Sequence, residues 1–383
     1  MKALILAAGK GTRLLPVSRD YPKPMLPILH KPVLECLIEQ LASHGVTEII
    51  INTSYLAEHI ESYFRHGERW GVSIAFSYEG YEADGQLHPT PLGSAGTLRR
   101  IQQHSGFFDD TFFVLCGDAL IDLDLTAMLA AHHASGATAT LALAQVPKQK
   151  ISQYGVVLQD ETGRVCAFQE KPSADEALGD LVNTGVYIFE PSILDWIPDT
   201  VPYDLGGQVF PAMAEAGAAL YGCHLPFNWI DIGRVYDYFD ISLAAVAGLI
   251  PAIKPQGREI QPGVRVGSNV RFNPKRCEVN GPIVIADSVT IEDGCFLQGP
   301  LWIGRGSVIE RGASLSSSLV FDYTRVGSQA MLDRVIASGR WCTTPQGIVI
   351  DPQKTGISWV LADSRTPRYQ IVQEEQAFLE QAF

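Results

Sequence analysis

Apolar residues recur at every sixth position along the C-terminal part of the chain. The spacing holds over seven successive positions: Ile285, Ile291, Leu297, Ile303, Ile309, Leu315 and Phe321. A strand alternates every two residues and a helix about every 3.6, so neither alone sustains this period. The hexapeptide repeat of a left-handed parallel β-helix does, because each apolar residue stacks below its equivalent in the next coil. The period therefore predicts a β-helix.

The pattern extends beyond these positions, with interruptions. Ile260, Val266 and Phe272 form an earlier run at the same spacing. Glycines beside the repeat suit its turns: Gly267, Gly294, Gly304 and Gly312. The spacing falters between Phe272 and Ile285 and again after Phe321, which predicts irregular coils there. Residues 338–383 lack a clear period, and we expect them to cap the solenoid.

The first 240 residues show a different pattern, in which short apolar runs alternate with amphipathic segments. We expect strands at Ala3–Ala8, Glu48–Asn52, Ser73–Tyr78 and Thr111–Cys116. We expect helices at Val33–Leu41, Tyr55–Phe64, Ala95–His104 and Leu125–His133. This alternation predicts a mainly parallel sheet covered on both faces. Ligands of such sheets bind beyond the carboxyl ends of the strands, where Gly9–Arg13 and Gly117-Asp118 fall.

The chain is long enough for two domains, each with its own core. Glycines and prolines gather between Leu243 and Pro262, which we interpret as a linker. The predicted domains are therefore residues 1–245 and residues 246–383.

The composition excludes several classes of protein. The net charge of −13 argues against a general nucleic-acid binder, which would present a basic face. The seven cysteines include no Cys-x-x-Cys pair, so neither a zinc site nor a disulfide framework is indicated. No apolar run approaches the ~20 residues that span a bilayer, and the apolar start is too short for a signal peptide. We expect a soluble, cytoplasmic protein.

The N-terminus has the chemistry of a polyphosphate site. The apolar run Ala3–Ala8 breaks into Gly9-Lys10-Gly11-Thr12-Arg13-Leu14, and Pro22-Lys23-Pro24-Met25 follows. Glycines let backbone N–H groups approach a phosphate, and Arg13 and Lys23 add cations. Leu14 replaces the third glycine of the dinucleotide fingerprint, and no Gly-Lys-Ser/Thr completes a P-loop. The glycines alone also suit an ordinary strand-to-helix turn.

Two aspartates are candidate metal ligands. Asp118 follows the apolar run Phe112–Cys116 and a glycine, and Asp231 lies in Trp229-Ile230-Asp231-Ile232-Gly233. An acid at the end of a buried strand can hold a hard cation, and Mg²⁺ usually takes one or two protein carboxylates plus phosphate oxygens. A capping or turn aspartate is the equal alternative.

The whole string LAAGKGTRLLPVSRDYPKPMLP, Leu6 to Pro27, closely resembles the signature of the sugar-1-phosphate nucleotidyltransferases. Further segments match this family in order: Gly117-Asp118, Tyr154–Val157, Glu170-Lys171-Pro172, Val182–Tyr187 and Trp229–Gly233. The resemblance implies a Rossmann-like, mixed but mostly parallel α/β sheet over the first 240 residues, and many members carry a coil domain as well. It also implies that the protein joins a sugar 1-phosphate to a nucleoside triphosphate, giving a nucleotide sugar and pyrophosphate.

The resemblance assigns roles to individual residues. It implies that Arg13 and Lys23 are catalytic, and that Asp118 and Asp231 bind Mg²⁺. Residues with an implied nucleotide-binding role are Leu6, Ala8, Gly9, Gly11, Thr12, Arg13, Lys23, Gly93 and Gly96. Residues with an implied role toward the sugar phosphate are Gly155, Glu170, Lys171, Asn183 and Thr184.

Base specificity depends on one loop. Leu92-Gly93-Ser94-Ala95-Gly96-Thr97-Leu98 resembles the base-recognition loop of the mannose-1-phosphate guanylyltransferases, so we expect GTP and mannose 1-phosphate as substrates. A helix start with Ser94 as its cap is the structural alternative. Tyr81 to Pro91 inserts polar and proline residues just ahead of this loop and could reshape the pocket. Glucose 1-phosphate with UTP or TTP is the alternative pair.

Two other classes remain as hypotheses. Hexapeptide coils often host acyltransferases with a histidine base, yet all nine histidines lie at or before His224. A non-catalytic regulatory subunit would show lost charges at the phosphate site, but Arg13, Lys23 and Lys171 are all present. We therefore expect the coil to be a structural element through which the chain forms a homo-oligomer.

Overall fold

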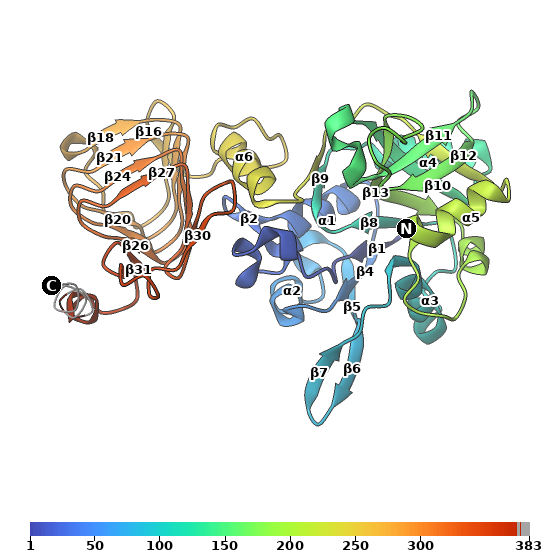
Figure 1. The fold of residues 1–383 in the computed structure, drawn as a ribbon, viewed down its shortest axis with the longest axis horizontal. Coiled ribbons are helices and arrows are strands. Elements are labelled where there is room, and N and C mark those ends of the chain that lie inside the picture. Colours follow the sequence, from blue (N-terminus) through green and yellow to red (C-terminus); the bar gives the residue numbers. More distant parts are fainter. Residues whose placement is uncertain (374–375, 377–383) are drawn as a thin grey trace. The chain divides into compact units, whose positions relative to one another are not determined.

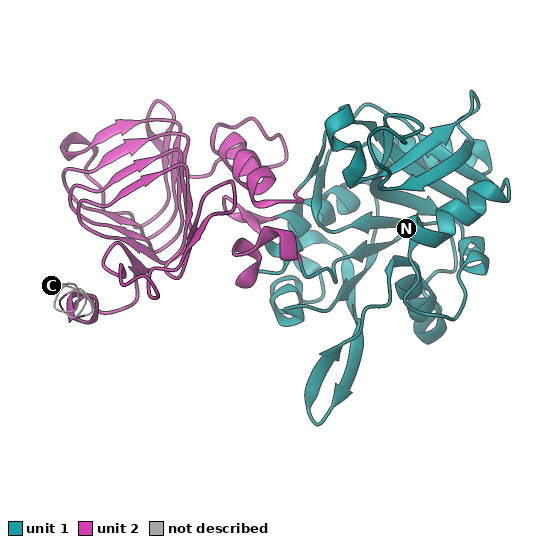
Figure 2. Cartoon of the chain, viewed as in Figure 1, with its two compact units in different colours: residues 1–10, 21–25, 33–231 teal, residues 11–20, 26–32, 232–383 magenta. Residues whose placement is uncertain are grey.

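The computed structural model describes residues 1–373 and 376, and its contacts divide the chain into two compact units (Figures 1 and 2). The sheet unit comprises Met1–Lys10, Tyr21–Met25 and Val33–Asp231. The coil unit comprises Gly11–Asp20, Leu26–Pro32 and the chain from Ile232 onward. Two short N-terminal segments thus belong to the coil unit although they precede most of the sheet.

The sheet unit is built on a mixed sheet in the order β12-β11-β13-β8-β1-β4-β5, with β10 pairing β13 and β14. The pairs β8–β1, β1–β4, β4–β5 and β10–β14 are parallel, and β13 runs antiparallel to β8 and β10. The strands are β1 (Lys2–Leu6), β4 (Glu48–Thr53), β5 (Ser73–Tyr78), β8 (Phe112–Cys116), β10 (Ala139–Gln145), β11 (Gly155–Gln159), β12 (Val165–Glu170), β13 (Leu181–Phe189) and β14 (Leu220–Cys223).

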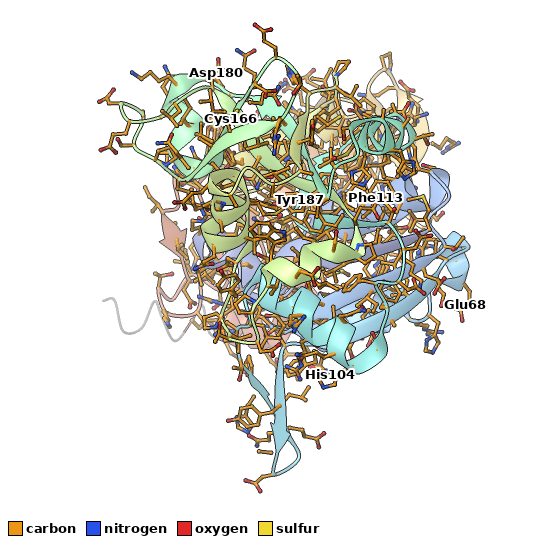
Figure 3. The ribbon with its side chains drawn as sticks, turned by 90° about the vertical axis from the view of Figure 1, so that its right-hand side faces the viewer. Glu68, His104, Phe113, Cys166, Asp180 and Tyr187 are labelled. Atoms are coloured by element: carbon orange, nitrogen blue, oxygen red, sulfur yellow. The ribbon has the colours of Figure 1, made fainter. Side chains whose placement is uncertain are left out.

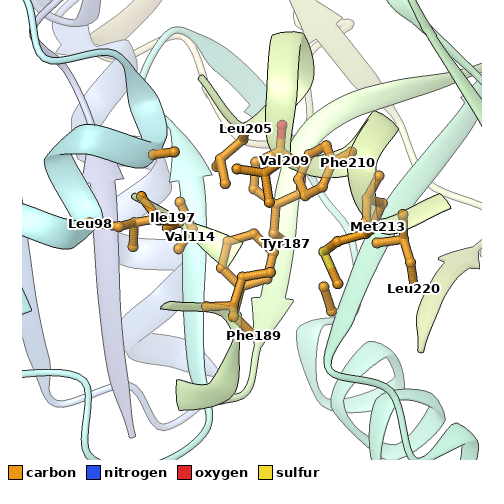
Figure 4. Close-up of a cluster of buried hydrophobic side chains, with 14 of the residues drawn as sticks. Leu98, Val114, Tyr187, Phe189, Ile197, Leu205, Val209, Phe210, Met213 and Leu220 are labelled. Atoms are coloured by element: carbon orange, nitrogen blue, oxygen red, sulfur yellow. The ribbon is translucent and has the colours of Figure 1, made fainter. Parts of the chain in front are cut away.

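Alternating side chains of the central strands build two cores. Leu4 of β1 faces one core, whereas Ala3 and Ile5 face the other. Helices α3 (Ser94–Ser105) and α5 (Phe210–Glu215) cover the first face; Figure 4 shows α5 residues packed there around Tyr187. Helices α1 (Val33–Ser43), α2 (Ala57–Phe64) and α4 (Leu125–Ser135) cover the second. The predicted strands and helices of this half, and the α/β class, are confirmed.

The sheet also brings two predicted loops together. Strands β1 and β8 are neighbours, with Leu6 opposite Cys116, so both end at the same edge. Gly117 N–H donates to Leu6 C=O at 2.8 Å. The glycine turn after β1 and the Gly117-Asp118 pair after β8 therefore start side by side, as expected for a ligand site of such a sheet.

The coil unit is a parallel β-helix with three faces. Successive apolar residues of the six-residue period lie on successive faces, and residues 18 positions apart pair directly: Ile285 with Ile303, Ile291 with Ile309, and Leu297 with Leu315. Each of these side chains is at most 5% exposed. Three hexapeptides therefore make one coil, and the fold predicted from the period is confirmed.

The strands of the three faces have these bounds. The first face holds β16 (Arg258–Gln261), β17 (Val264–Val266), β19 (Ile283–Ile285), β22 (Leu301–Ile303), β25 (Leu319–Val320), β28 (Ile336–Ala337), β29 (Cys342–Thr343) and β30 (Val349–Ile350). The second holds β20 (Thr290–Ile291), β23 (Val308–Ile309), β26 (Thr324–Val326) and β31 (Leu361–Asp363). The third holds β18 (Glu278–Asn280), β21 (Phe296–Gln298), β24 (Ser314–Ser316) and β27 (Met331–Asp333).

Phe321 departs from the predicted role. The coil that contains it is one residue shorter, so Val320, not Phe321, pairs with Ile303 and lies in the coil interior. Phe321 is still buried, but it packs against Trp302 and Trp341 outside the stacked core. The six-residue spacing thus correctly predicted that Phe321 is buried, but the prediction that it stacks in the coil interior was wrong.

The expected linker and cap are partly regular structure. Helix α6 (Val235–Val246) runs through the start of the predicted linker Leu243–Pro262, and β16 occupies its end. At the far end, β29 and β31 pair antiparallel with earlier coils, which ends the parallel stacking. Residues 374–375 and 377–383 of the predicted cap lie outside the described residues. No helix in the described part of the chain has the length and apolarity needed to cross a membrane.

A buried histidine lies near the sheet edge opposite to the glycine turn. His132 on α4 is 1% exposed; its Nδ1 lies 2.7 Å from Thr140 Oγ1 and its Nε2 lies 3.1 Å from Glu190 Oε1. Burial lowers the pKa of His132 below its ordinary value, although the Glu190 carboxylate opposes the shift. The folded protein therefore keeps this imidazole neutral at pH values where the unfolded chain protonates it.

This predicts a loss of stability in mild acid. As the pH falls through about 6.5, the unfolded state binds a proton that the folded state refuses, so the free energy of unfolding falls until the folded pKa is reached. One group contributes a slope of at most about 1.4 kcal/mol per pH unit. Urea unfolding at several pH values should show that His132→Gln removes this part of the slope, whereas the exposed His66→Gln keeps it. An unchanged slope in His132→Gln would contradict the assignment.

Candidate active site

Two acids from distant parts of the sequence meet on one lysine. Strands β9 (Ala119–Ile121) and β15 (Trp229–Asp231) pair antiparallel with Asp231 opposite Ala119, which places Asp231 beside Asp118. Lys23 Nζ donates to Asp118 Oδ2 and lies 3.9 Å from Asp231 Oδ1. The Lys23 side chain is only 10% exposed. The structure thus brings together the two predicted metal ligands and one predicted catalytic cation.

This arrangement fits a hard divalent cation. Both carboxylates already face a single positive charge, and hard cations prefer carboxylate oxygens. Among residues 1–373 and 376, no cluster of three or more His, Cys, Asp or Glu side chains forms a ready metal cage. A pair of carboxylates is what Mg²⁺ uses when substrate phosphates complete its shell. The residues present therefore suit a metal that arrives with a nucleotide.

Cys116 lies next to these acids but is not a nucleophile. Burial, together with the neighbouring Asp118 and against the opposing charge of Lys23, raises its pKa to about 12. The thiol is therefore protonated at neutral pH, and only a thiolate is reactive. A Cβ built on Gly185 would lie 2.7 Å from the Cys116 Sγ. The absence of a side chain at Gly185 therefore lets β13 pack closely against the end of β8 beside the acids.

A buried polar network fixes the glycine turn from behind. Asn52 at the end of β4 accepts from the Ala7 N–H and donates through Nδ2 to Glu79 Oε1 at 2.6 Å. Thr97 on α3 also donates to Glu79 Oε1. All three side chains are at most 7% exposed. Sequence analysis missed this network, although a polar residue ending the apolar run Ile49–Ile51 was a signal for it.

The turn itself leaves space above its backbone. Gly9 is exposed, and a Cβ built on it would meet no atom within 4 Å. Leu6 and Ala8 flank the turn and are half-buried. Gly11, Thr12 and Arg13 belong to the coil unit, where Gly11 has a φ of +62° and Thr12 and Arg13 are exposed. The structure thus supports an accessible turn at Gly9 and an accessible guanidinium on the segment that follows.

The predicted base-recognition loop begins α3. Gly93, with a φ of +75°, packs so closely that a Cβ would come within 2.5 Å of the Tyr203 carbonyl oxygen. The Ala95 and Gly96 N–H groups both donate to that carbonyl. Ser94 is not the cap: it is the first helical residue, and Asp204 Oδ1 accepts from its N–H at 3.0 Å. The N–H groups of Ser94, Ala95 and Gly96 are therefore already bonded within the fold.

The Tyr81–Pro91 insertion forms a hairpin ahead of this loop, made of β6 (Gly80–Ala83) and β7 (Gln86–Pro89). It projects from the body of the unit in Figures 1 and 3. Its base is tied down, because Thr90 N–H donates to Glu79 C=O and Arg100 Nη2 donates to Gly80 C=O. The hairpin therefore leaves the sheet next to the buried Asn52–Glu79–Thr97 network.

Three of the residues assigned to the sugar phosphate, Gly155, Glu170 and Lys171, meet around a second carboxylate. Lys171 Nζ donates to Glu170 Oε1, at the end of β12. Gly155 lies opposite Glu170 in the sheet, and a Cβ on it would approach Phe168 to 2.5 Å. A Cβ on Gly206 would approach Glu170 Oε2 to 2.8 Å. Both glycines therefore leave room for the Glu170 carboxylate and the ring beside it.

Asn183 and Thr184 play different parts. Asn183 Nδ2 donates to Tyr187 OH at 2.9 Å. Thr184 Oγ1 is buried and donates to the Ala142 carbonyl at 2.8 Å, where the β10–β13 register shifts, so it closes this irregularity. Burial raises the pKa of Tyr187 well above its ordinary value, and the nearby Glu170 and Asp118 carboxylates add to the shift. The Tyr187 hydroxyl therefore stays protonated at neutral pH.

Comparison with known proteins identifies the family. The family profile described as "Nucleotidyl transferase" matches residues 2–247. A Synechocystis protein named UTP–glucose-1-phosphate uridylyltransferase is 47% identical over 374 residues, covering 98% of this chain and 96% of that protein. A mannose-1-phosphate guanylyltransferase of Mycobacterium tuberculosis is 30% identical over 333 residues, and the alignment covers 87% of this chain and 83% of that protein.

A plant relative and a solved structure extend the comparison. Mannose-1-phosphate guanylyltransferase 1 of Arabidopsis thaliana is 32% identical over 88% of this chain and 91% of its own. The solved structure is a UDP-glucose pyrophosphorylase complexed with UDP-glucose. Its TM-score is 0.56 at 22% sequence identity, and the match covers 64% of this chain and 98% of that chain. This likeness concerns the fold alone. The profile and the relatives together show that the chain belongs to the nucleotidyl transferase family, as a sugar-1-phosphate nucleotidyltransferase.

Proposed function

We propose that the protein transfers a uridylyl group from UTP to glucose 1-phosphate. The reaction class rests on the convergence of Lys23, Asp118 and Asp231 at the edge where β1 and β8 end. The choice of substrates rests on the 47% identity to a uridylyltransferase along almost the whole chain, against 30–32% to guanylyltransferases. The comparisons thus favour the alternative substrate pair over the GTP and mannose 1-phosphate expected from the loop.

The structure explains why the loop is a weak guide to the base. Gly93 and Gly96 are small because the 201–203 segment packs against them: a Cβ on Gly96 would come within 2.9 Å of a Val201 methyl. A motif fixed by packing can recur in enzymes that read different bases. In this chain the two glycines therefore answer a packing requirement, which by itself says nothing about the base.

The chemistry requires no covalent intermediate. A phosphate oxygen of glucose 1-phosphate attacks the α-phosphorus of UTP, a new P–O bond forms, and the bond to the β-phosphate bridge breaks so that pyrophosphate leaves. Such a transfer depends on positioning and on neutralising phosphate charge. The protonated Cys116 thiol is consistent with this, because no nucleophilic side chain is needed.

We assign the charges as follows. Lys23 neutralises the nucleotide phosphates and Arg13 the departing pyrophosphate, while Lys171 holds the attacking phosphate. Glu170 and Asn183 present acceptors and donors to the sugar hydroxyls, as recognition of a hydroxylated ligand requires. Asp118 and Asp231 would hold Mg²⁺, which when bound neutralises charge on the phosphate oxygens.

A substrate panel tests the proposal directly. Pyrophosphate release is measured with UTP, GTP, dTTP, ATP and CTP, each with glucose 1-phosphate and with mannose 1-phosphate. We expect the highest kcat/KM for UTP with glucose 1-phosphate. A higher value for GTP with mannose 1-phosphate would restore the reading of the loop, and no turnover with any pair would favour the regulatory-subunit hypothesis.

Replacing Lys23 should change both catalysis and the response to Mg²⁺. In Lys23→Met, two carboxylates face each other without their ammonium, which destabilises the fold in EDTA. We expect kcat to fall roughly 10²–10³-fold, as for loss of one charge-stabilising group. Added Mg²⁺ should raise Tm more in this variant than in wild type, because no cation competes for the acids.

A matched control uses a surface lysine. Lys148 pairs with Asp175 in the open and its side chain is 64% exposed. Lys148→Met should change neither kcat nor the Mg²⁺ response. An equal Tm rise with Mg²⁺ in Lys23→Met and wild type would count against a metal at Asp118 and Asp231.

Filling the space above the glycine turn should separate binding from stability. Gly9→Ala adds a methyl group where no protein atom lies within 4 Å, so Tm should not change. If phosphates approach this backbone, the methyl displaces them, and KM for UTP should rise roughly tenfold, the cost of about one hydrogen bond. Gly179→Ala, equally unobstructed but remote in sequence, is the control. A normal KM in Gly9→Ala would exclude close phosphate contact at this turn.

A further inference from the structure

The segment that carries Arg13 is fastened to the last part of the β-helix. Asp20, at its end, accepts from Trp341 Nε1 at 3.0 Å through Oδ2. Its other oxygen, Oδ1, accepts from Arg340 Nη1 at 3.3 Å. All of these residues belong to the coil unit. The Asp20 carboxylate therefore accepts from both Trp341 and Arg340. Asp20 and Trp341 are 321 positions apart in the sequence.

Trp341 is a rigid anchor. Its side chain is fully buried, and its ring packs edge-on against Phe321 with centroids 5.5 Å apart. Phe321 in turn packs against Trp302 and Tyr238. The cluster reaches the second N-terminal segment of the unit, because Tyr238 OH donates to Pro27 C=O at 2.5 Å. A close-packed aromatic group of this kind resists displacement, so its N–H donor has a defined position.

The segment Gly11–Asp20 is itself held by buried side chains and internal hydrogen bonds, so fixing Asp20 also fixes the backbone near Arg13. Leu14, Val17 and Ser18 are at most 1% exposed, although the segment is short. Ser18 Oγ donates to Gly11 C=O at 2.8 Å, and Leu14 N–H donates to the same carbonyl at 2.9 Å. The end held by Asp20 is therefore tied to the turn at Gly11. Thr12 and Arg13 remain exposed between these fixed points.

We propose that Trp341, acting through Asp20, positions Arg13 for the nucleotidyl transfer. This inference rests on the proposed function, in which Arg13 neutralises the departing pyrophosphate. Within the coil unit, the β-helix then holds the segment that carries Arg13. Trp341, in the connection between β28 and β29, supplies the fixed point, and Trp341 and Asp20 are positioning residues that touch no substrate.

The two contacts to Asp20 differ in weight. The Arg340 side chain is 67% exposed and 3.3 Å from the carboxylate, and exposed ion pairs of this kind contribute little. The indole N–H is buried, and a buried donor that loses its acceptor carries a desolvation cost. The geometry therefore predicts that the neutral Asp20→Asn, which still offers an oxygen to the indole, retains far more activity than Asp20→Ala.

The kinetic test uses the full chain with Asp20→Ala, Asp20→Asn and Trp341→Phe. Misplacing a catalytic group by about 1 Å can cost up to 10²-fold, so we expect kcat to fall roughly tenfold to a hundredfold in Asp20→Ala and Trp341→Phe. KM for glucose 1-phosphate should not change, because Arg13 does not hold the sugar phosphate. Asp20→Asn should recover most of kcat. Asp293→Ala, which breaks a coil carboxylate–arginine pair of 2.7 Å, is the control and should behave as wild type.

A double variant and hydrogen exchange complete the test. Asp20→Ala with Trp341→Phe should lose no more activity than either single variant, because both remove one contact. Amides of residues 11–20 should exchange faster in each single variant but not in Asp293→Ala. Since the Asp20 side chain is partly exposed whereas Trp341 is fully buried, Asp20→Ala keeps the proposal testable if Trp341→Phe does not fold.

The outcomes separate this proposal from the proposed function. Wild-type kcat in Asp20→Ala, additive losses in the double variant, or unchanged exchange in residues 11–20 would each overturn the positioning role. If wild type makes a different nucleotide sugar, the proposed substrates fail, but the same variants can be assayed with the true pair. The exchange measurement requires no substrate and stands in either case.

Discussion

The candidate site depends on one contact, in which the Lys23 ammonium lies against the carboxylates of Asp118 and Asp231. Asp118 and Asp231 are brought together by the short β9–β15 ladder, and like charges at that distance repel unless a cation lies between them. Lys23 supplies that cation in the protein without ligands. The same pair of acids that would hold Mg²⁺ is therefore stabilised beforehand by the lysine that would bind the phosphates. This constraint links the folding of the N-terminal signature to the closing strand of the sheet unit.

Periodic features of the fold could be predicted from the sequence because they reflect local geometry. The six-residue period follows directly from stacking, and Ile285 pairs with Ile303 as three hexapeptides per coil require. The parallel strands β1, β4 and β8 are buried on both faces and so appear as continuous apolar runs. Phe321 marks the limit: a coil shortened by one residue keeps the apolar spacing but moves the side chain out of the stacked core. The six-residue period alone does not show where a coil is one residue shorter, and so does not show whether a residue after that point faces the coil interior.

The candidate site was predictable where a motif carries charge and unpredictable where distant segments supply the partner. Lys23, Asp118 and Asp231 were found by the signature and by acids that follow apolar strands. Glu79 was missed because its partners, Asn52 and Thr97, come from other elements, and an isolated glutamate in a polar stretch gives no signal of burial. A helix cap at Ser94 was the structural alternative for its loop, yet it is Asp204, 110 positions further along the chain, that accepts from the Ser94 N–H. Tertiary contacts decide these roles, and local patterns do not contain them.

The division of the chain assigns two N-terminal segments to the coil unit, which the sequence does not suggest. The chain leaves the sheet unit after Lys10, returns at Tyr21, leaves again after Met25 and returns at Val33. Lys23 therefore sits on a short stretch whose flanking segments on both sides are held by the coil unit, through Asp20 to Trp341 and through Pro27 to Tyr238. The β-helix itself contains no histidine, yet within the coil unit it holds the segment that carries Arg13 through Asp20, and α6 holds the other N-terminal segment through Pro27.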